Sequence, residues 1–198
     1  LLLADEGLAE TAVPPTISPR PQTDDPLPLS FAQQRLWFLD TLTPGSSLFN
    51  TPLALRLTGQ LDEFALAQAC QALVQRHESL RTTFTAVSGT PQQIICEKWP
   101  VVLPKKDVVA DEVAMVLQTA VQQPFDLEKG PLLRFHLLRL NQTEHILLLI
   151  FHHIIFDGWS ADIILDELAT FYDAYCHSQQ PHLAELPIQY ADYALWQR

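Results

Sequence analysis

The sequence has 198 residues, 47% of them hydrophobic and 18% charged, which is enough for one compact domain with an apolar core. Its formal net charge of −11 argues against nucleic acid and anionic membranes as partners, because both attract basic surfaces. No apolar run reaches the ~20 residues that span a bilayer, so we expect a cytoplasmic protein. The three widely spaced cysteines, Cys70, Cys96 and Cys176, predict reduced, buried thiols and neither a disulfide framework nor a metal site.

Residues 1–26 are predicted to form a linker between domains. Prolines recur among polar residues from Pro14 to Pro28, and proline is poorly tolerated inside a helix. The preceding segment, Leu1 to Glu10, could be the end of a helix that belongs to an earlier domain. Because the chain begins without methionine and stops after a predicted helix, we expect a piece of a longer protein, with a folded domain over residues 27–198.

The first half of this domain alternates helices with short strands. The capping-box pattern at Ser30 to Gln33 predicts a helix that ends near Leu42. Strict alternation over Leu53 to Leu57 predicts a half-buried strand. Asp62 is the expected N-cap of a helix over about Glu63 to Glu78. A hairpin is predicted next, from Thr83–Ala86 and Gln92–Cys96 around Ser88-Gly89-Thr90, and then a loop from Trp99 to Lys106.

The second half contains the most apolar segment of the chain. A helix over Asp111 to Gln123 is expected to end at Pro124, and a strand follows over Leu133 to Leu140. The unbroken apolar run up to Phe151 predicts a strand buried on both faces, and the short turn between these two strands makes them antiparallel neighbours. An amphipathic helix is predicted over Ala161 to Tyr175.

Candidate functional residues lie where the buried strand gives way to a loop and a helix. His152 and His153 are adjacent, so on a strand they point to opposite faces and only one of them can enter a given cavity. Asp157 is expected to brace the loop, and Gly158 to allow a tight turn or the close approach of a substrate. Chemistry is common at such strand ends, because the scaffold is rigid and the loop is accessible.

The pattern H-H-x-x-x-D-G at His152–Gly158 resembles the signature of nonribosomal peptide synthetase condensation domains. Three further segments resemble motifs of the same family, in the same order: S-F-A-Q-Q-R-L-W-F-L at Ser30–Leu39, R-H-E-S-L-R-T-T-F at Arg76–Phe84, and Y-A-D-Y-A-L-W at Tyr190–Trp196. The resemblance implies an α/β fold, an α+β two-layer sandwich of chloramphenicol acetyltransferase type. In it a mixed or largely antiparallel sheet carries helices packed on one side. The chain would be the N-terminal of two such lobes.

The resemblance also implies a reaction between two carrier proteins. The amine of an aminoacyl acceptor on the downstream carrier attacks the acyl or peptidyl thioester on the upstream donor carrier, and an amide forms. No cofactor or metal is bound directly, because the carriers deliver their own phosphopantetheine arms. His153 would handle the proton or position the amine, since imidazole exchanges protons near neutral pH. His152 would be structural, and the backbone N–H of Gly158 could face the oxyanion.

Three more residues are expected to support this site. Asp157 is predicted to form a buried ion pair with Arg81, or failing that with Arg35. Trp159 is expected to pack against its surroundings and not to bind substrate.

Several alternatives remain open on the sequence alone. Q-R-L-W-F-L favours an L-configured donor, although Phe156 departs from the serine usual in that subclass. An epimerisation domain or another acyltransferase with the same signature is possible, whereas a heterocyclisation domain would carry an Asp pair in place of the histidines. A metal site on His152, His153 and Asp157 is disfavoured because adjacent strand residues diverge, and no cysteine lies in a nucleophile-type setting. Finally, the single lobe is expected to be inactive by itself, and its role could be to dock carriers.

Overall fold

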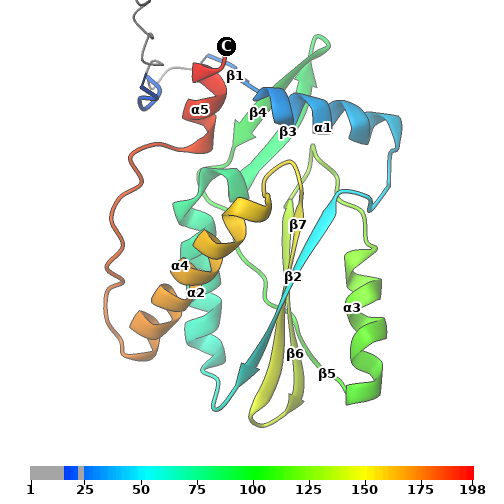
Figure 1. Ribbon diagram of the computed structural model, residues 1–198, viewed down its shortest axis with the longest axis vertical. Helices are drawn as coiled ribbons and strands as arrows, with labels where there is room; N and C mark the ends of the chain where they lie inside the picture. The colour runs from blue at the N-terminus through cyan, green and yellow to red at the C-terminus, as the bar shows by residue number, and fades with distance from the viewer. Residues whose placement is uncertain (1–15, 22–24) are drawn as a thin grey trace, which may run out of the picture.

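The computed structural model describes residues 16–21 and 25–198, and shows an α/β fold in which two sheets carry helices (Figure 1). Residues 1–15 and 22–24 are outside this description, and so is the helix end suggested for Leu1 to Glu10.

The larger sheet positions the candidate site. Its strand order is β2-β7-β6-β5, in which β2 (Asn50–Thr58), β7 (Glu144–His152) and β6 (Leu133–Asn141) are antiparallel, and β5 (Lys105–Asp107) runs parallel to β6. Every residue of β7 after Glu144 is buried, which confirms the prediction of a strand covered on both faces. The edge strand β5 begins where the sequence predicts a loop, because its exposed Lys-Lys-Asp sequence has no apolar alternation.

A smaller sheet has the order β1-β4-β3. The strands β3 (Thr82–Val87) and β4 (Thr90–Ile95) form the predicted hairpin, and the short strand β1 (Leu27–Pro28) pairs with β4. Ser88 and Gly89 connect the hairpin with φ values of 52° and 80°, as a tight turn between twisted strands requires.

Helices cover both faces of the larger sheet, which differs from the expectation that they lie on one side. α2 (Glu63–Arg76) and α4 (Gly158–Cys176) pack together on the face formed by Leu147, Leu149 and Phe151. α3 (Val113–Val121) covers the opposite face, where Ala120 packs with Leu148 and Ile150. Successive β7 residues alternate between two cores, so the fold class is confirmed but the arrangement has a third layer.

The predicted caps explain where two of the helices begin. Ser30 caps α1 (Phe31–Leu42) through a capping box with Gln33, and Asp62 caps α2 by accepting hydrogen bonds from the N–H groups of Phe64 and Ala65. α2 is shorter than predicted and ends before a 3₁₀ turn, η1 (Glu78–Arg81); another such turn, η2 (Ala110–Glu112), precedes α3. None of the helices in the described ranges combines the length and apolar composition needed to cross a membrane.

Candidate active site

The two adjacent histidines occupy opposite environments, as the strand geometry predicts. His152 is the last residue of β7 and is only 1% exposed, whereas His153 begins the following turn and is exposed to solvent. The backbone N–H of His152 donates to the carbonyl of Leu132, and that of His153 donates to the carbonyl of Phe49. The backbone at this strand end is therefore held from both sides, and the imidazole of His153 is presented on a rigid support.

The ring of His153 has a defined tautomer when it is neutral. Its Nδ1 lies 2.7 Å from the carbonyl oxygen of Phe156, which can only accept, so Nδ1 carries the proton. The second nitrogen, Nε2, then keeps its lone pair, and no described residue hydrogen bonds to it. This arrangement suits a proton acceptor, because one ring nitrogen is oriented by the protein and the other is left for a reaction partner.

His152 has the environment of a structural residue. Its Nδ1 accepts a hydrogen bond of 3.1 Å from the N–H of Ile154, and the rings of Phe49 and Phe125 lie against it. Nε2 is buried without a hydrogen-bond partner among the described residues, and lies 3.6 Å from Oδ1 of Asp40, too far for a hydrogen bond. Burial, reinforced by the neighbouring His153, lowers the pKa of His152 to about 4, so this ring is neutral at physiological pH.

A small cavity beside His153 collects residues from all four sequence motifs. It has a volume of about 290 Å³. Its walls include Gln33 and Arg35 from α1, Ser79 from η1, Asp157 from the turn before α4, and Tyr190, the first residue of α5 (Tyr190–Trp196). Segments more than 150 residues apart in sequence therefore meet at this cavity, and the hydroxyls of Ser30 and Tyr190, 3.1 Å apart, connect the start of α1 to α5 beside it.

The predicted ion pair between Asp157 and an arginine does not form, so this prediction is wrong for the lobe described. Asp157 is exposed, and it caps α4: its Oδ1 accepts from the N–H of Ser160 at 3.0 Å and from the Ser160 hydroxyl at 2.7 Å. The guanidinium of Arg81 instead donates to the carbonyl of Cys96 and lies 3.8 Å from Glu78. Arg35 is exposed and has no ion-pair partner among the described residues, although it lines the same cavity as Asp157. A carboxylate at a helix start finds donors in its own first turn, which removes the need for a distant cation.

Trp159 differs from expectation, and the fold itself gives no steric reason for glycine at position 158. Trp159, which the sequence analysis expects to pack, has a side chain that is 90% exposed in the first turn of α4. Gly158 is the first residue of α4, and a Cβ added there would have no neighbour within 4 Å, so no contact within the lobe requires glycine at this position.

The cysteines only partly match their prediction. Cys70 is buried, and desolvation raises the pKa of its thiol to about 12, but Cys96 is partly exposed and Cys176 is exposed. All are free thiols, and none of them lines the cavity beside His153. Across residues 16–21 and 25–198, no group of three or more His, Cys, Asp or Glu side chains is placed to hold a metal ion.

The structure adds residues that the sequence did not single out. Asp40 faces His152, and Phe49 and Phe125 enclose it, from segments far apart in the chain. Local periodicity carries no signal for these contacts. Gln33, Ser79 and Tyr190 each lie in a segment that resembles a family motif, so the motif pattern was a signal for them.

Comparison with known proteins identifies the family. The sequence model described as "Condensation domain" matches residues 23–198. The chain is 50% identical over 182 residues to a linear gramicidin synthase of Brevibacillus parabrevis, covering 88% of this chain and 2% of that protein. It is 42% identical over 206 residues to phosphinothricin tripeptide synthetase PhsC of Streptomyces viridochromogenes, covering 99% of this chain and 19% of that protein.

Solved structures agree in fold. The X-domain from teicoplanin biosynthesis, in its complex with OxyB, is similar with a TM-score of 0.86 and 33% identity, over 92% of this chain and 40% of that chain. The first condensation domain of the calcium-dependent antibiotic synthetase is similar with a TM-score of 0.75 and 26% identity, over 81% of this chain and 40% of that chain. The chain therefore spans less than half of the solved domains it resembles. With a family match from residue 23 to the last residue, and four motifs that meet at one cavity, the chain belongs to the condensation domains of nonribosomal peptide synthetases.

Proposed function

We propose that residues 27–198 form the N-terminal lobe of a condensation domain that makes amide bonds, and that residues 1–26 are the linker from an upstream carrier protein. In the reaction, the amine of a carrier-bound aminoacyl group attacks the thioester carbonyl of a carrier-bound donor. The new C–N bond forms, the C–S bond breaks, and the donor's phosphopantetheine leaves as the thiol. The motif Q-R-L-W-F-L favours an L-configured donor residue.

The observation that carries this proposal is the presentation of His153. Its ring stands at the edge of the cavity with Nδ1 committed to Phe156 and with Nε2 available. Nε2 could accept the proton that the attacking amine must lose, or hold the amine in line with the carbonyl. A thioester is already activated toward attack by an amine. The residues of the chain therefore need only orient the two substrates, accept the proton from the amine and keep water out of the site.

The exposed apolar side chains support the proposal that the whole domain has a second lobe. Large apolar residues are exposed on α1, on the segment after it and at the start of α4: Phe31, Phe38, Leu42, Leu48, Trp159 and Ile163. In a domain of two lobes this surface would be covered, and the cavity beside His153 would be closed from water. A lobe by itself leaves the reaction open to solvent, so we expect the described chain to be inactive without its partner lobe.

The test is His153→Ala in the intact two-lobe domain, assayed with two loaded carriers. Amide formation should fall roughly 10²- to 10⁴-fold, the range for loss of a general acid–base group. His177→Ala is the matched control, because His177 is an exposed histidine at the far end of α4. Wild-type rates in His153→Ala would exclude this residue from the chemistry and would overturn the proposal.

A second candidate function is docking without catalysis. It is favoured by one comparison: the X-domain with the same fold was solved in complex with another protein, OxyB. The two functions separate in one experiment, in which the intact domain is given both loaded carriers. Product formation supports condensation, whereas carrier binding without product, in both wild type and His153→Ala, supports docking.

A further inference from the structure

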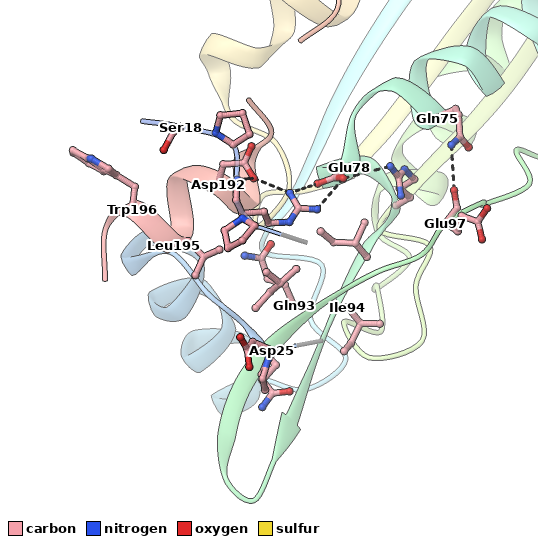
Figure 2. Close-up of a pocket in the computed structure, with 18 residues that line it drawn as sticks. Ser18, Asp25, Gln75, Glu78, Gln93, Ile94, Glu97, Asp192, Leu195 and Trp196 are labelled. Carbon is pink, nitrogen blue, oxygen red and sulfur yellow. Dashed lines mark hydrogen bonds and ion pairs between the residues drawn. The ribbon is translucent and has the colours of Figure 1, made fainter. Parts of the chain in front are cut away.

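The end of the predicted linker is attached to the folded lobe through Arg20. Its guanidinium places Nη1 2.8 Å from Oδ1 of Asp192 and 2.8 Å from Oε2 of Glu78, and places Nη2 3.0 Å from Oε1 of Glu78. Its backbone N–H adds a longer hydrogen bond of 3.3 Å to Asp192. Figure 2 shows Asp192 and Glu78 converging on these bonds from two different elements, α5 and η1. Arg20, which donates to both carboxylates, precedes residue 23, where the family match begins.

The carboxylate of Asp192 has a hydrogen-bond partner besides Arg20, and Glu78 is held through its backbone. Asp192 is only 4% exposed, and its Oδ2 accepts a hydrogen bond of 2.7 Å from the N–H of Gln189. The side chain of Gln189 accepts from the N–H of Glu78 and donates to the carbonyl of Arg76, which ties α5 to the end of α2. The Asp192 carboxylate and the backbone of Glu78 are therefore oriented by bonds within the folded chain, which lowers the ordering that binding Arg20 requires.

Charge explains why the site needs a cation. Glu78 and Asp192 both lie within 3 Å of one guanidinium, so without it two carboxylates would face each other at a partly buried place. Hydrogen bonding to Glu78 raises the pKa of Arg20 although burial opposes it. Burial also opposes ionisation of Asp192, but hydrogen bonds from Gln189 and Arg20 lower its pKa. Arg20 is thus the cation that lies against both carboxylates.

We propose that Arg20 is the anchor of the linker: it holds residues 18–21 against η1 and α5, so that the preceding chain leaves the lobe from this point and not from residue 27. The same segment forms one wall of a cavity of about 1220 Å³ whose other walls include Gln93, Glu97 and Leu195 (Figure 2). The anchor takes the stretch from Arg20 to Pro26 out of the tether between the carrier and the lobe, which shortens the reach of that tether by up to ~25 Å at ~3.5 Å per residue.

This anchor has a consequence that rests on the proposed function. If an upstream carrier protein precedes the linker, a shorter free tether raises the effective concentration of that carrier at the lobe. Effective concentration falls roughly as the −3/2 power of tether length. If Leu1 to Glu10 end a helix of the preceding domain, loss of the anchor extends the tether from about nine residues (11–19) to about sixteen (11–26), which should lower the effective concentration about two- to threefold.

Amide hydrogen exchange in the whole chain tests the anchor itself. In Arg20→Ala, exchange at the backbone amide of residue 20, whose N–H donates to Asp192, should become roughly ten- to a hundredfold faster, the effect of losing a hydrogen bond to a charged group. Arg56→Ala is the control. It removes the exposed ion pair between Arg56 on β2 and Glu144 on β7, and should leave exchange at the amide of residue 20 unchanged. Unchanged exchange in Arg20→Ala would overturn the anchor.

A second variant separates a specific anchor from a general loss of stability. Asp192→Asn keeps the size of the side chain and should also accelerate exchange at the amide of residue 20, and adding it to Arg20→Ala should cause little further acceleration. If the two substitutions accelerate exchange independently, by factors that multiply, Arg20 and Asp192 do not act as a pair and the anchor is wrong.

The consequence for delivery is measured in the intact domain with its upstream carrier. Arg20→Ala should lower the condensation rate about two- to threefold when the carrier is tethered, and leave it unchanged when the loaded carrier is added as a separate protein. An equal effect in both formats would overturn the role in delivery. Absence of product in the wild-type domain with separate carriers would instead contradict the proposed function, and the exchange measurement would still decide the anchor.

Discussion

At the end of β7, two adjacent histidine side chains, His152 and His153, lie in different environments. His152 still belongs to the strand and points into an apolar pocket, where an ionised ring would lose its hydration without gaining a hydrogen bond at Nε2. His153 has left the strand, keeps access to water, and is oriented by a single bond to Phe156. Burial therefore makes His152 a structural residue, and exposure leaves His153 accessible for the chemistry that we propose.

The buried ring should make stability depend on pH. With a folded-state pKa of about 4 and an unfolded value of about 6.5, the unfolded chain binds the extra proton between these values, so the free energy of unfolding decreases as pH falls through this window. We expect His152→Gln to abolish about 2–3 kcal/mol of the difference in unfolding free energy between pH 7 and pH 4.5, measured by urea denaturation.

The control for this prediction is His177→Gln, which changes an exposed histidine at the end of α4 and should keep the full pH dependence. The comparison uses the change with pH and not the absolute stability, because any substitution at a buried position also alters packing. If wild type and His152→Gln lose the same free energy on acidification, His152 is not held neutral in the folded state.

At the scale of elements, the start of α4 sets the conformation of the loop after His153. Asp157 has extended backbone angles, with φ of −136° and ψ of 179°, and its carboxylate accepts two hydrogen bonds from Ser160. The bond from the Ser160 N–H satisfies a backbone donor that has no acceptor within the helix. The negative carboxylate is also attracted to the positive end of the helix dipole. The aspartate of the family signature thus acts here on its own helix.

This geometry predicts a modest loss of stability from Asp157→Ala. Loss of a cap costs about 1 kcal/mol, and Asp157→Asn or Asp157→Ser should restore most of it, because either side chain can cap. Asp166→Ala, in the middle of the same helix and exposed, is the matched control. Chemical denaturation of the chain measures these differences. A loss of about 3–5 kcal/mol that Asn fails to restore would instead indicate the buried ion pair that the structure lacks.

At the scale of the whole molecule, a buried carboxylate joins the helices on one face of the sheet. Glu167 on α4 accepts from Nε of Arg76 at 3.0 Å and from Nε2 of His77 at 2.6 Å, both at the end of α2. Arg76 also donates to the carbonyl of Ala184, beyond the end of α4. Arg76 and His77 of the R-H-E motif therefore connect the end of α2 to α4 and to the segment that follows α4.

Breaking this connection should destabilise the fold more than breaking a surface pair. Glu167→Ala leaves the Arg76 guanidinium partly buried without its carboxylate, and we expect a loss of about 3 kcal/mol in the free energy of unfolding. Glu144→Ala removes the more exposed pair with Arg56 and should cost less than about 1 kcal/mol. Equal losses for the two variants in urea denaturation would show that Glu167 contributes no more than a surface charge.

The sequence by itself determined features that depend on residues close together in the chain. The apolar run predicted a strand buried on both faces, Ser30 and Asp62 predicted helix starts, and the four motifs indicated the family. In each case a local rule of backbone geometry, or a residue pattern readable along the chain, was sufficient. His152 and His153 diverge as predicted, but the reason is that β7 ends at His152 and His153 begins the turn that follows it.

Only the tertiary structure decided which distant residues meet. The opposite placement of α3, the choice of Ser160 over Arg81 as partner of Asp157, and the binding of Arg20 to Asp192 all depend on how the elements pack. A charged side chain pairs with whichever group packing brings within about 3 Å, and several groups in the sequence could satisfy it equally well. Pairing across the fold is therefore a result of packing, which local sequence patterns do not encode.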